Sequence, residues 1–281
     1  MNIELSSMHP NPEANQLIGT TEWHAIDWQK SFRLLKNLRS RIFRAAQEGN
    51  YKKVRSLQKL MLRSYTNRVV SVRRITQLNA GKNTPGVDRI VVRTAKEREK
   101  LVEELRQHQP WKAKPARRVY IPKANGKQRP LGIPVIKDRC LQTMVVQALE
   151  PEWEAKFEAG SYGFRPGRSC HDAIERIFRY ARPDSQRKWV VDADIRGAFD
   201  HIDHSFLLER IGRFPAKGLL KQWLEAGYLE ANVVYPTDSG TPQGGSCSPL
   251  LANIALHGLE QAMGMSYQYG GGRTQTCGLR G

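Results

Sequence analysis

The sequence predicts an α+β protein, and three patterns carry that prediction. Apolar residues recur at helical spacing through much of residues 28–80, which predicts helices with one buried face. Residues 117–134 form two extended arms around Asn125-Gly126, a dipeptide that favours a tight turn between antiparallel strands. Residues 188–195 are mostly apolar and rich in β-branched side chains, which indicates a short buried strand.

Composition indicates a polyanionic partner. The 281 residues include 45 Lys and Arg against 27 Asp and Glu, so the formal charge is +18 and the pI about 10.0. Such a balance favours nucleic acid over an acidic surface or a neutral substrate. There is neither an apolar run long enough to span a membrane nor a signal-peptide core, so we expect a cytoplasmic protein. The four cysteines are far apart in the sequence, which predicts free thiols without a zinc knuckle or disulfide framework.

The first 80 residues read as a basic helical extension. Residues 1–15 are polar and are expected to be flexible, whereas 16–80 should form one helix from Trp28 to Gly49 and a second, longer helix through Val72. Residues 51–80 contain eight basic side chains and no acidic one. A solvated helix face normally mixes charges, so nucleic-acid contact is favoured over a merely soluble face. The candidate RNA-binding residues are Lys52, Lys53, Arg55, Arg63, Arg73 and Arg74.

Residues 81–160 are expected to form a second region. A turn at residues 84–88 leads to a mixed-charge, solvent-facing helix over residues 94–108. The predicted hairpin follows, and the stretch from Lys112 to Arg139 contains nine basic residues and a single acid. A hairpin with Arg and Lys on both arms suits triphosphate oxygens or a nucleic-acid backbone. A helix with a buried apolar face is then predicted for residues 138–150.

A third region, residues 161–263, combines loops and helices. A Gly- and Arg-containing loop at 161–169 should open a helix near residue 171, and further helices are predicted for 204–212, capped by Asp203, and for 216–229. The glycine-rich block from Gly240 leads into another helix near Ser248 or Pro249. Residues 264–281 contain six glycines and no acid, and are expected to be a flexible tail.

Asp194 is the leading candidate for chemistry. It stands where the apolar run of the predicted strand ends, so its carboxylate is expected to project into a cleft. Hard divalent cations prefer carboxylate oxygens, so an aspartate at the end of a buried strand is a suitable metal ligand. An aspartate that only caps a turn is the alternative. Asp192 lies two residues earlier, on the same predicted strand face, and is the weaker candidate.

Two blocks of sequence resemble neighbouring palm motifs of reverse transcriptases encoded by bacterial group II introns. They are Asp192-Ala-Asp-Ile-Arg-Gly-Ala-Phe-Asp200 and Gly240-Thr-Pro-Gln-Gly-Gly-Ser-Cys-Ser-Pro-Leu-Leu-Ala-Asn253. The turn at 84–88, the hairpin and the 161–169 loop extend the resemblance to roughly residues 20–263. It implies a right-hand polymerase, with fingers in 81–160, fingers and part of the palm in 161–263, and the basic extension before them.

The resemblance also implies roles for individual residues. Asp194 would be the catalytic carboxylate, and Asp194 with Ile195 would lie at a Mg²⁺ site. Phe199 would lie under the sugar of the incoming nucleotide, although core packing is an alternative for this ring, and Asp200 would make a structural hydrogen bond. The remaining nucleotide-binding residues would be Arg117, Lys123, Arg129 and Gln243.

The implied function is RNA-directed DNA synthesis combined with binding of intron RNA to help it splice. The implied partners are intron RNA, an RNA template with a DNA primer, and a deoxynucleoside triphosphate. The family's aromatic-x-Asp-Asp tetrapeptide does not occur before Gly281, so we expect an incomplete chain that is inactive alone. Two further hypotheses remain: a non-catalytic RNA-binding remnant or splicing accessory, and a palm completed by a separate chain.

Overall fold

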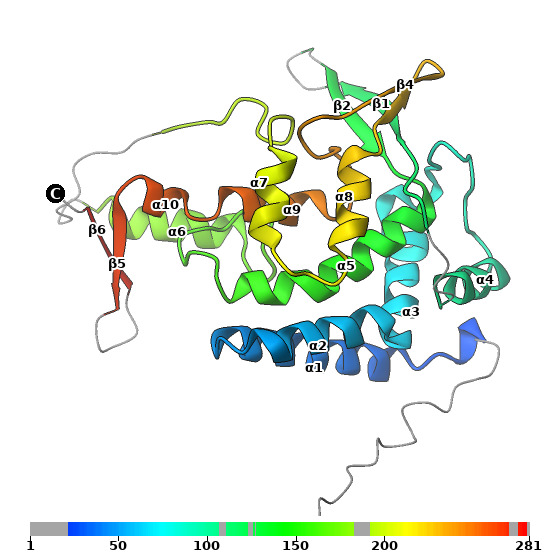
Figure 1. The fold of residues 1–281 in the computed structure, drawn as a ribbon, viewed down its shortest axis with the longest axis horizontal. Helices are drawn as coiled ribbons and strands as arrows, with labels where there is room; N and C mark the ends of the chain where they lie inside the picture. Colours follow the sequence, from blue (N-terminus) through cyan, green and yellow to red (C-terminus); the bar gives the residue numbers. More distant parts are fainter. Residues whose placement is uncertain are drawn as a thin grey trace, which may run out of the picture.

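The computed structural model describes residues 22–106, 111–122, 126, 128–182, 192–269 and 275–279 (Figure 1). Its longer helices are α1 (Trp28–Gln47), α2 (Tyr51–Arg63), α3 (Tyr65–Arg73), α4 (Ala95–Arg106), α5 (Ile136–Glu154), α6 (Cys170–Tyr180), α7 (His204–Ile211), α8 (Lys217–Glu225) and α9 (Ser248–Leu256). Short helical turns are η2 (Trp23–Ala25), the π-helical η3 (Arg74–Leu78), η4 (Ala80–Asn83) and α10 (Leu259–Ala262). The strands are β1 (Ala116–Pro122), β2 (Gln128–Ile133), β3 (Tyr228–Glu230), β4 (Val233–Tyr235), β5 (Met265–Tyr269) and β6 (Gln275–Leu279).

Helix α5 is the central element of the fold. Helices α1, α2 and α3 all pack against it, and its opposite side contacts α9. Figure 1 shows α5 crossing the molecule between the α1–α2 pair and the group α7, α8 and α9. Most of its side chains are buried, including Met144, Val145, Ala148 and Leu149 of the predicted apolar face. The helix begins two residues earlier and ends four residues later than the sequence predicted.

The basic extension is helical, but its second helix is divided. Ser64 adopts an extended backbone (φ −63°, ψ 130°) between α2 and α3, and its hydroxyl accepts a hydrogen bond from the Asn67 amide. Serine at this position caps a new helix and so ends the preceding one. The prediction of a single longer helix through Val72 is therefore wrong at this residue.

The predicted hairpin is confirmed. Strands β1 and β2 pair antiparallel from Arg117 opposite Ile133 to Pro122 opposite Gln128. Strand β3 adds to β1 in parallel, and β4 pairs with β3, which gives the sheet order β2-β1-β3-β4.

The β3–β4 hairpin was not predicted, because residues 216–229 were expected to be wholly helical. Helix α8 ends at Glu225, and the two strands are joined by Ala231 and Asn232, both with positive φ. A two-residue turn with positive φ at both positions favours Asn and Gly. Alanine, the residue at 231, rarely adopts positive φ, so the sequence did not indicate this turn.

The predicted strand over 188–195 is not present in its described portion. Residues 192–195 are exposed, are not assigned to a strand and pair with none of the strands that the structure describes, whereas 188–191 lie outside the described residues. A strand is stabilised by hydrogen bonds to a neighbour, so an apolar, β-branched sequence alone is insufficient.

Residues 264–281 also differ from expectation. In place of a structureless tail, β5 and β6 pair antiparallel, with Met265 opposite Leu279 and Tyr269 opposite Gln275. Residues such as Tyr267, Tyr269 and Thr276 favour strands. The prediction of a flexible tail relied on the glycine content and did not consider the strand preference of these residues.

One apolar core joins the two halves of the described chain. It includes Val54 and Met61 from the basic extension together with Leu207, Leu220 and Ile254 from the last helices. Across the residues that the structure describes, no helix is both long and apolar enough to cross a membrane.

Candidate active site

Three segments that are distant in sequence meet beside β2. The Thr241 amide donates to the carbonyl of Phe199 at 2.7 Å, and the Gly240 amide donates to Ile202 at 2.8 Å. The Gly132 amide of β2 donates to the carbonyl of Gln243 at 2.6 Å. These backbone bonds join the loop at 196–203, the loop at 239–247 and the basic hairpin, and we call this place the loop junction.

Two glycines allow this close approach. A Cβ at Gly240 would lie 2.7 Å from the carbonyl oxygens of Phe199 and Asp200, and one at Gly244 would lie 2.7 Å from that of Gly132. Both also have positive φ, 81° and 121°. Any side chain would therefore clash with backbone and would be strained as well.

Side chains continue the connection across the loop junction. Arg129 Nε donates to Gln243 Oε1 at 3.0 Å, and Gln243 Nε2 donates to Asp200 Oδ1 at 3.3 Å. The basic hairpin is thus connected through Gln243 to the carboxylate that follows Phe199. Asp200 makes the structural hydrogen bond expected of it.

Phe199 lies half-buried at the edge of the loop junction. Its ring packs against the core and meets the ring of Phe164 edge to face, with centroids 5.9 Å apart and planes at 76°. Both the nucleotide-contacting and the core-packing interpretations therefore remain compatible with its position.

The three basic residues predicted to grip the triphosphate have different surroundings. Arg129 is exposed at the loop junction. Arg117 shares the same face of the hairpin by register, but it is half-buried and its Nε donates to the carbonyl of Pro85 at 3.1 Å. Lys123 lies outside the described residues. Arg117 thus supports the turn at 84–88, whereas Arg129 contacts Gln243.

The same turn is held from α5. Arg139, 5% exposed, donates to the carbonyls of Gly81 at 2.9 Å and Thr84 at 2.5 Å. Burial lowers the pKa of this guanidinium from its usual value, and the negative charge of Asp88 acts in the opposite sense. Charge alone does not distinguish a buried arginine from a solvated one, so the sequence reasoning missed this anchoring role.

Neighbouring Asp138 is a second buried anchor. It is fully buried and accepts hydrogen bonds from the indoles of Trp111 at 2.7 Å and Trp223 at 2.8 Å, and from the amide of Lys114 at 3.2 Å. Burial raises the pKa of its carboxyl, and these three donors partly offset that rise. Asp138 on α5 thus holds the segment that precedes β1, through Trp111 and Lys114, and also holds α8, through Trp223.

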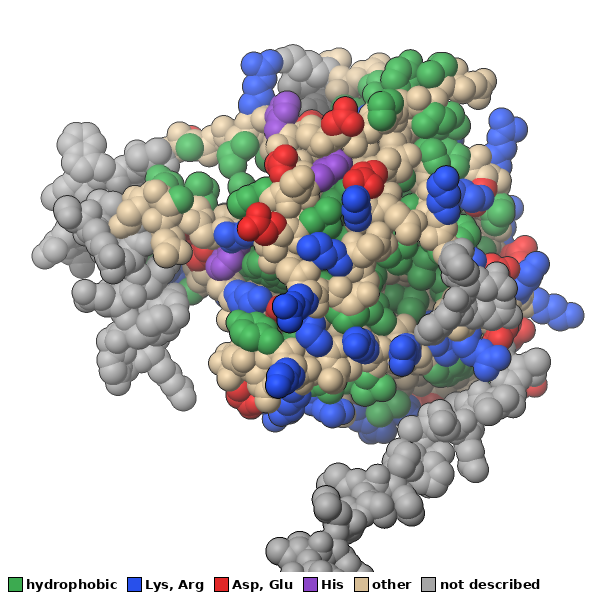
Figure 2. All heavy atoms as spheres, in the orientation of Figure 1, with side chains coloured by type: hydrophobic (Ala, Val, Ile, Leu, Met, Phe, Trp, Pro, Cys, Tyr) green, Lys and Arg blue, Asp and Glu red, His purple; other side chains and the backbone are tan. Residues whose placement is uncertain are grey.

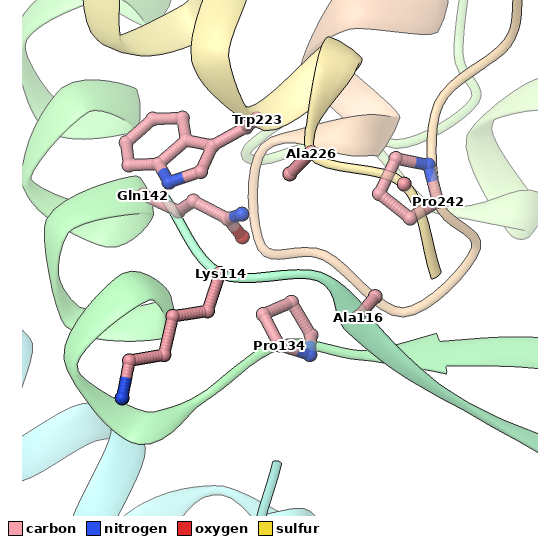
Figure 3. A pocket seen from close by; sticks show the side chains of 8 residues that line it. Lys114, Ala116, Pro134, Gln142, Trp223, Ala226 and Pro242 are labelled. Atoms are coloured by element: carbon pink, nitrogen blue, oxygen red, sulfur yellow. The ribbon is translucent and has the colours of Figure 1, made fainter. Parts of the chain in front are cut away.

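The cavity beside this anchor is too small for a substrate. Figure 3 shows side chains from α5 (Gln142), α8 (Trp223), β1 (Ala116) and the 239–247 loop (Pro242) surrounding it. It encloses about 10 Å³, which is at the lower limit for one water molecule. These elements therefore pack closely around a cavity that cannot hold a substrate. We take the solvent-exposed loop junction as the candidate site instead.

Asp194 and Ile195, predicted to lie at a Mg²⁺ site, do not form a complete site with Asp192. Asp192, Asp194 and Ile195 are exposed on the segment that leads into the loop junction. Within the described ranges, no three His, Cys, Asp or Glu side chains are grouped so that they could share a metal ion. Mg²⁺ needs several oxygen ligands in near-octahedral geometry, so the residues described do not fit this ion as a finished centre.

The candidate RNA-binding residues divide into exposed and occupied groups. Lys52, Lys53, Arg63 and Arg74 are exposed. Arg55 pairs with the buried carboxylate of Glu152 at 2.5 Å, so the protein itself engages part of its guanidinium, and its contact with RNA stays a prediction. Arg73 is half-buried, with its guanidinium 4.2 Å from the Trp28 ring centroid.

Helix α1 contributes basic residues that the sequence reasoning missed. Figure 2 shows one face of the molecule, in the orientation of Figure 1. Lys and Arg side chains gather over the lower half of this face, where α1 and α2 lie in Figure 1. A helical-wheel count over residues 28–47 could have found those on α1. We define the basic helical surface as the exposed set Lys30, Arg33, Lys36, Arg41, Arg44, Lys52, Lys53, Lys59, Arg63 and Arg74.

Comparison with known proteins identifies the family of this chain. A family model described as the N-terminal domain of reverse transcriptase matches residues 23–105, and one described as reverse transcriptase (RNA-dependent DNA polymerase) matches residues 121–269. The second match covers more than half of the chain. The chain therefore belongs to the reverse transcriptase family, in the branch of the group II intron-encoded proteins and maturases.

Three relatives show the extent of the similarity. Protein YkfC of Escherichia coli (strain K12) is 39% identical over 213 residues, which are 71% of this chain and 55% of that protein. The group II intron-encoded protein LtrA of Lactococcus lactis subsp. cremoris is 47% identical over 152 residues, 52% of this chain and 25% of that protein. Maturase-like protein 1 of Euglena gracilis is 29% identical over 238 residues, 83% of this chain and 51% of that protein. The chain thus spans about half, or less, of the relatives it matches.

Proposed function

We propose that this chain supplies the fingers, part of the palm and the RNA-gripping extension of a group II intron reverse transcriptase that also assists splicing. The observation that carries the proposal is the loop junction, where Arg129, Gln243 and Asp200 form one hydrogen-bonded series beside Phe199. Its ligands would be an RNA template with a DNA primer and a deoxynucleoside triphosphate, and intron RNA would bind the basic helical surface.

Each residue of the loop junction has a role that its chemistry supports. A guanidinium has five N–H donors, so Arg129 can hold Gln243 through Nε and still present a fork to phosphate oxygens. Asp200 and Arg129 together fix the side-chain amide of Gln243, which would otherwise rotate freely. Half-buried Phe199 would lie under the sugar of the incoming nucleotide and hinder a 2′-hydroxyl by contact alone.

Asp194 remains the proposed catalytic carboxylate, and Mg²⁺ the proposed ion. The described residues do not complete a site for it, so further carboxylates would have to come from elsewhere, as in the hypothesis of a separate chain that completes the palm. Such carboxylates are the ligands that a pair of divalent ions needs for phosphoryl transfer.

The RNA-binding part of this proposal is tested by the salt dependence of affinity. Wild type is expected to bind intron RNA with an affinity that falls steeply as salt rises, because each neutralised phosphate releases counterions. Lys36→Ala/Lys52→Ala/Lys59→Ala should weaken binding and reduce the salt slope by about one for each phosphate that the variant no longer neutralises. Lys217→Ala/Lys221→Ala on α8 is the control outside this surface, and equal effects of both sets would contradict the assignment.

A second candidate, a non-catalytic RNA-binding remnant or splicing accessory, is favoured by one observation. The residues described contain no group of three potential metal ligands. Template-directed DNA synthesis with Mg²⁺ distinguishes the candidates. Incorporation that is lost in Asp194→Ala would establish catalysis by this chain, and incorporation only after mixing with a second polypeptide would establish a completed palm. Salt-sensitive RNA binding without incorporation in either format would leave the accessory role.

A further inference from the structure

Phe164 combines exposure with an unusual backbone conformation. Its side chain is 66% exposed, and its φ of 55° lies in the left-handed region. A bulky residue in this region is strained, and glycine or asparagine would adopt the same conformation at lower cost. Neither core packing nor ordinary turn chemistry explains a phenylalanine at this position.

The loop is fixed on both sides of Phe164. Asn253 of α9 donates through Nδ2 to the carbonyl of Gly163 at 2.9 Å. Arg165, 6% exposed, donates through Nη2 to the carboxylate of Glu154 at 2.8 Å, and through Nη1 to the carbonyls of Glu158 and Ser161 at 2.7 and 2.9 Å. These bonds hold the backbone on both sides of Phe164 in place in spite of the strain.

The ring extends the aromatic surface of the loop junction. It meets Phe199 edge to face, with centroids 5.9 Å apart, so Phe199 fixes one edge while most of Phe164 remains open to solvent. A rigid, exposed ring next to a polymerase-type site is suited to one ligand chemistry above others. The flat face of a nucleobase stacks on such a ring and loses little side-chain entropy in doing so.

We propose that Phe164 is a stacking platform for a nucleobase of single-stranded template RNA at the loop junction. This inference rests on the proposed function, because it assigns a template contact to the same site. Base stacking on an aromatic side chain is sequence-tolerant, which agrees with a protein that must copy any base. Backbone strain concentrated at one exposed aromatic residue is the kind of feature found at ligand-contacting positions.

The test uses the full chain and short single-stranded RNAs, each with 2-aminopurine at a different position. With wild type, fluorescence at one or two adjacent positions should be quenched on binding. Phe164→Ala should abolish that quenching and weaken RNA binding about 5-fold or more, which corresponds to the loss of one stacked base. Phe164→Trp should restore both signals.

Two further variants separate ligand contact from folding. Phe164→Asn removes the ring but suits the positive φ, so it should fold at least as well as wild type and still lose quenching and affinity. Phe178→Ala is the matched control, because this ring on α6 is 64% exposed and lies in a regular helix. It should leave RNA binding unchanged.

The outcomes distinguish this inference from the function on which it rests. Wild type that binds RNA with quenching equal to that of Phe164→Ala and Phe164→Asn would overturn the stacking role and leave the proposed function intact. Equal losses in Phe164→Ala and Phe178→Ala would also overturn it, since exposed rings in general would then explain the effect. Failure of wild type to bind RNA would overturn both proposals together.

Discussion

The buried carboxylate of Glu152 shows why a basic sequence does not by itself define a nucleic-acid surface. Its side chain is 1% exposed and accepts hydrogen bonds from Arg55 at 2.5 and 3.0 Å, from Gln58 at 2.8 Å and from Lys156 at 2.8 Å. Arg55 is 97 residues away in sequence. Nothing in a run of Lys and Arg indicates which one meets a distant acid, so this residue was assigned to RNA by charge alone.

We predict that Glu152→Gln lowers the free energy of unfolding by about 1–3 kcal/mol near neutral pH. The substitution leaves the positive charges of Arg55 and Lys156 without their buried partner, although both remain partly open to solvent. Urea denaturation measures the loss. Glu175→Gln on α6 is the control, because its pair with Arg179 is exposed and should contribute less than about 0.5 kcal/mol.

This contribution should also depend on pH in a defined direction. Burial acts to raise the pKa of Glu152, but hydrogen bonds and charge from Arg55 and Lys156 outweigh it, so the pKa is lowered overall. A carboxyl with a depressed folded pKa stabilises above its unfolded pKa, and that stability is lost as pH falls through the folded value. The stability difference between wild type and Glu152→Gln should therefore shrink below about pH 4.5. A difference that stays constant with pH would contradict the role given to the carboxylate.

At the scale of elements, the sequence was most informative where a local signal decides the structure. Asp203 caps α7 by accepting a hydrogen bond from the Phe206 amide, and Pro249 opens α9, both as predicted. The hairpin register followed from its turn dipeptide and extended arms. Elements that depend on distant partners were less predictable. Strand β3 forms because β1 lies beside it and pairs with it. Residues 192–195 form no strand because none of the described strands lies beside them.

The candidate site was predictable in its membership but not in its contacts. The two motif blocks assigned Phe199 and Gln243 to the incoming nucleotide and a structural hydrogen bond to Asp200, and the structure shows that the partner in this bond is Gln243. The series from Arg129 through Gln243 to Asp200 depends on how β2 packs against two loops, which no local pattern encodes. Arg117 has the same residue type and hairpin face as Arg129, yet it turns to Pro85.

We predict that Gly240→Ala destabilises the protein by about 1–3 kcal/mol more than Gly49→Ala. Both glycines have positive φ (81° and 67°), so both substitutions carry the backbone strain. Only the Cβ at 240 would also collide with the carbonyls of Phe199 and Asp200, whereas nothing lies within 4 Å of one at 49. Thermal and urea unfolding of the two variants give the comparison, and equal losses would show that the loop junction can move apart without cost.

At the scale of the whole molecule, the basic extension and the polymerase-like region share one structural support. Helix α5 packs against α1, α2 and α3 and also contacts α9, and Asp138 on it joins α8 through Trp223. The family models divide the chain near residues 105–121, but the buried core crosses that boundary. A separately folded RNA-binding module would instead have its own core.

The shared core predicts a single cooperative unfolding transition for the described chain. Met61 in α2 and Leu251 in α9 are both buried, one in each half, and truncating such side chains to alanine typically costs about 2–5 kcal/mol. Met61→Ala and Leu251→Ala should each shift the whole transition, with far-UV circular dichroism and tryptophan fluorescence giving the same midpoint. Independent halves would give two transitions, with each substitution moving only its own. Helix α5 packs against both halves, so unfolding of either half would expose one face of this helix and destabilise the other half. We therefore expect the basic extension to bind RNA only when the whole described chain is folded.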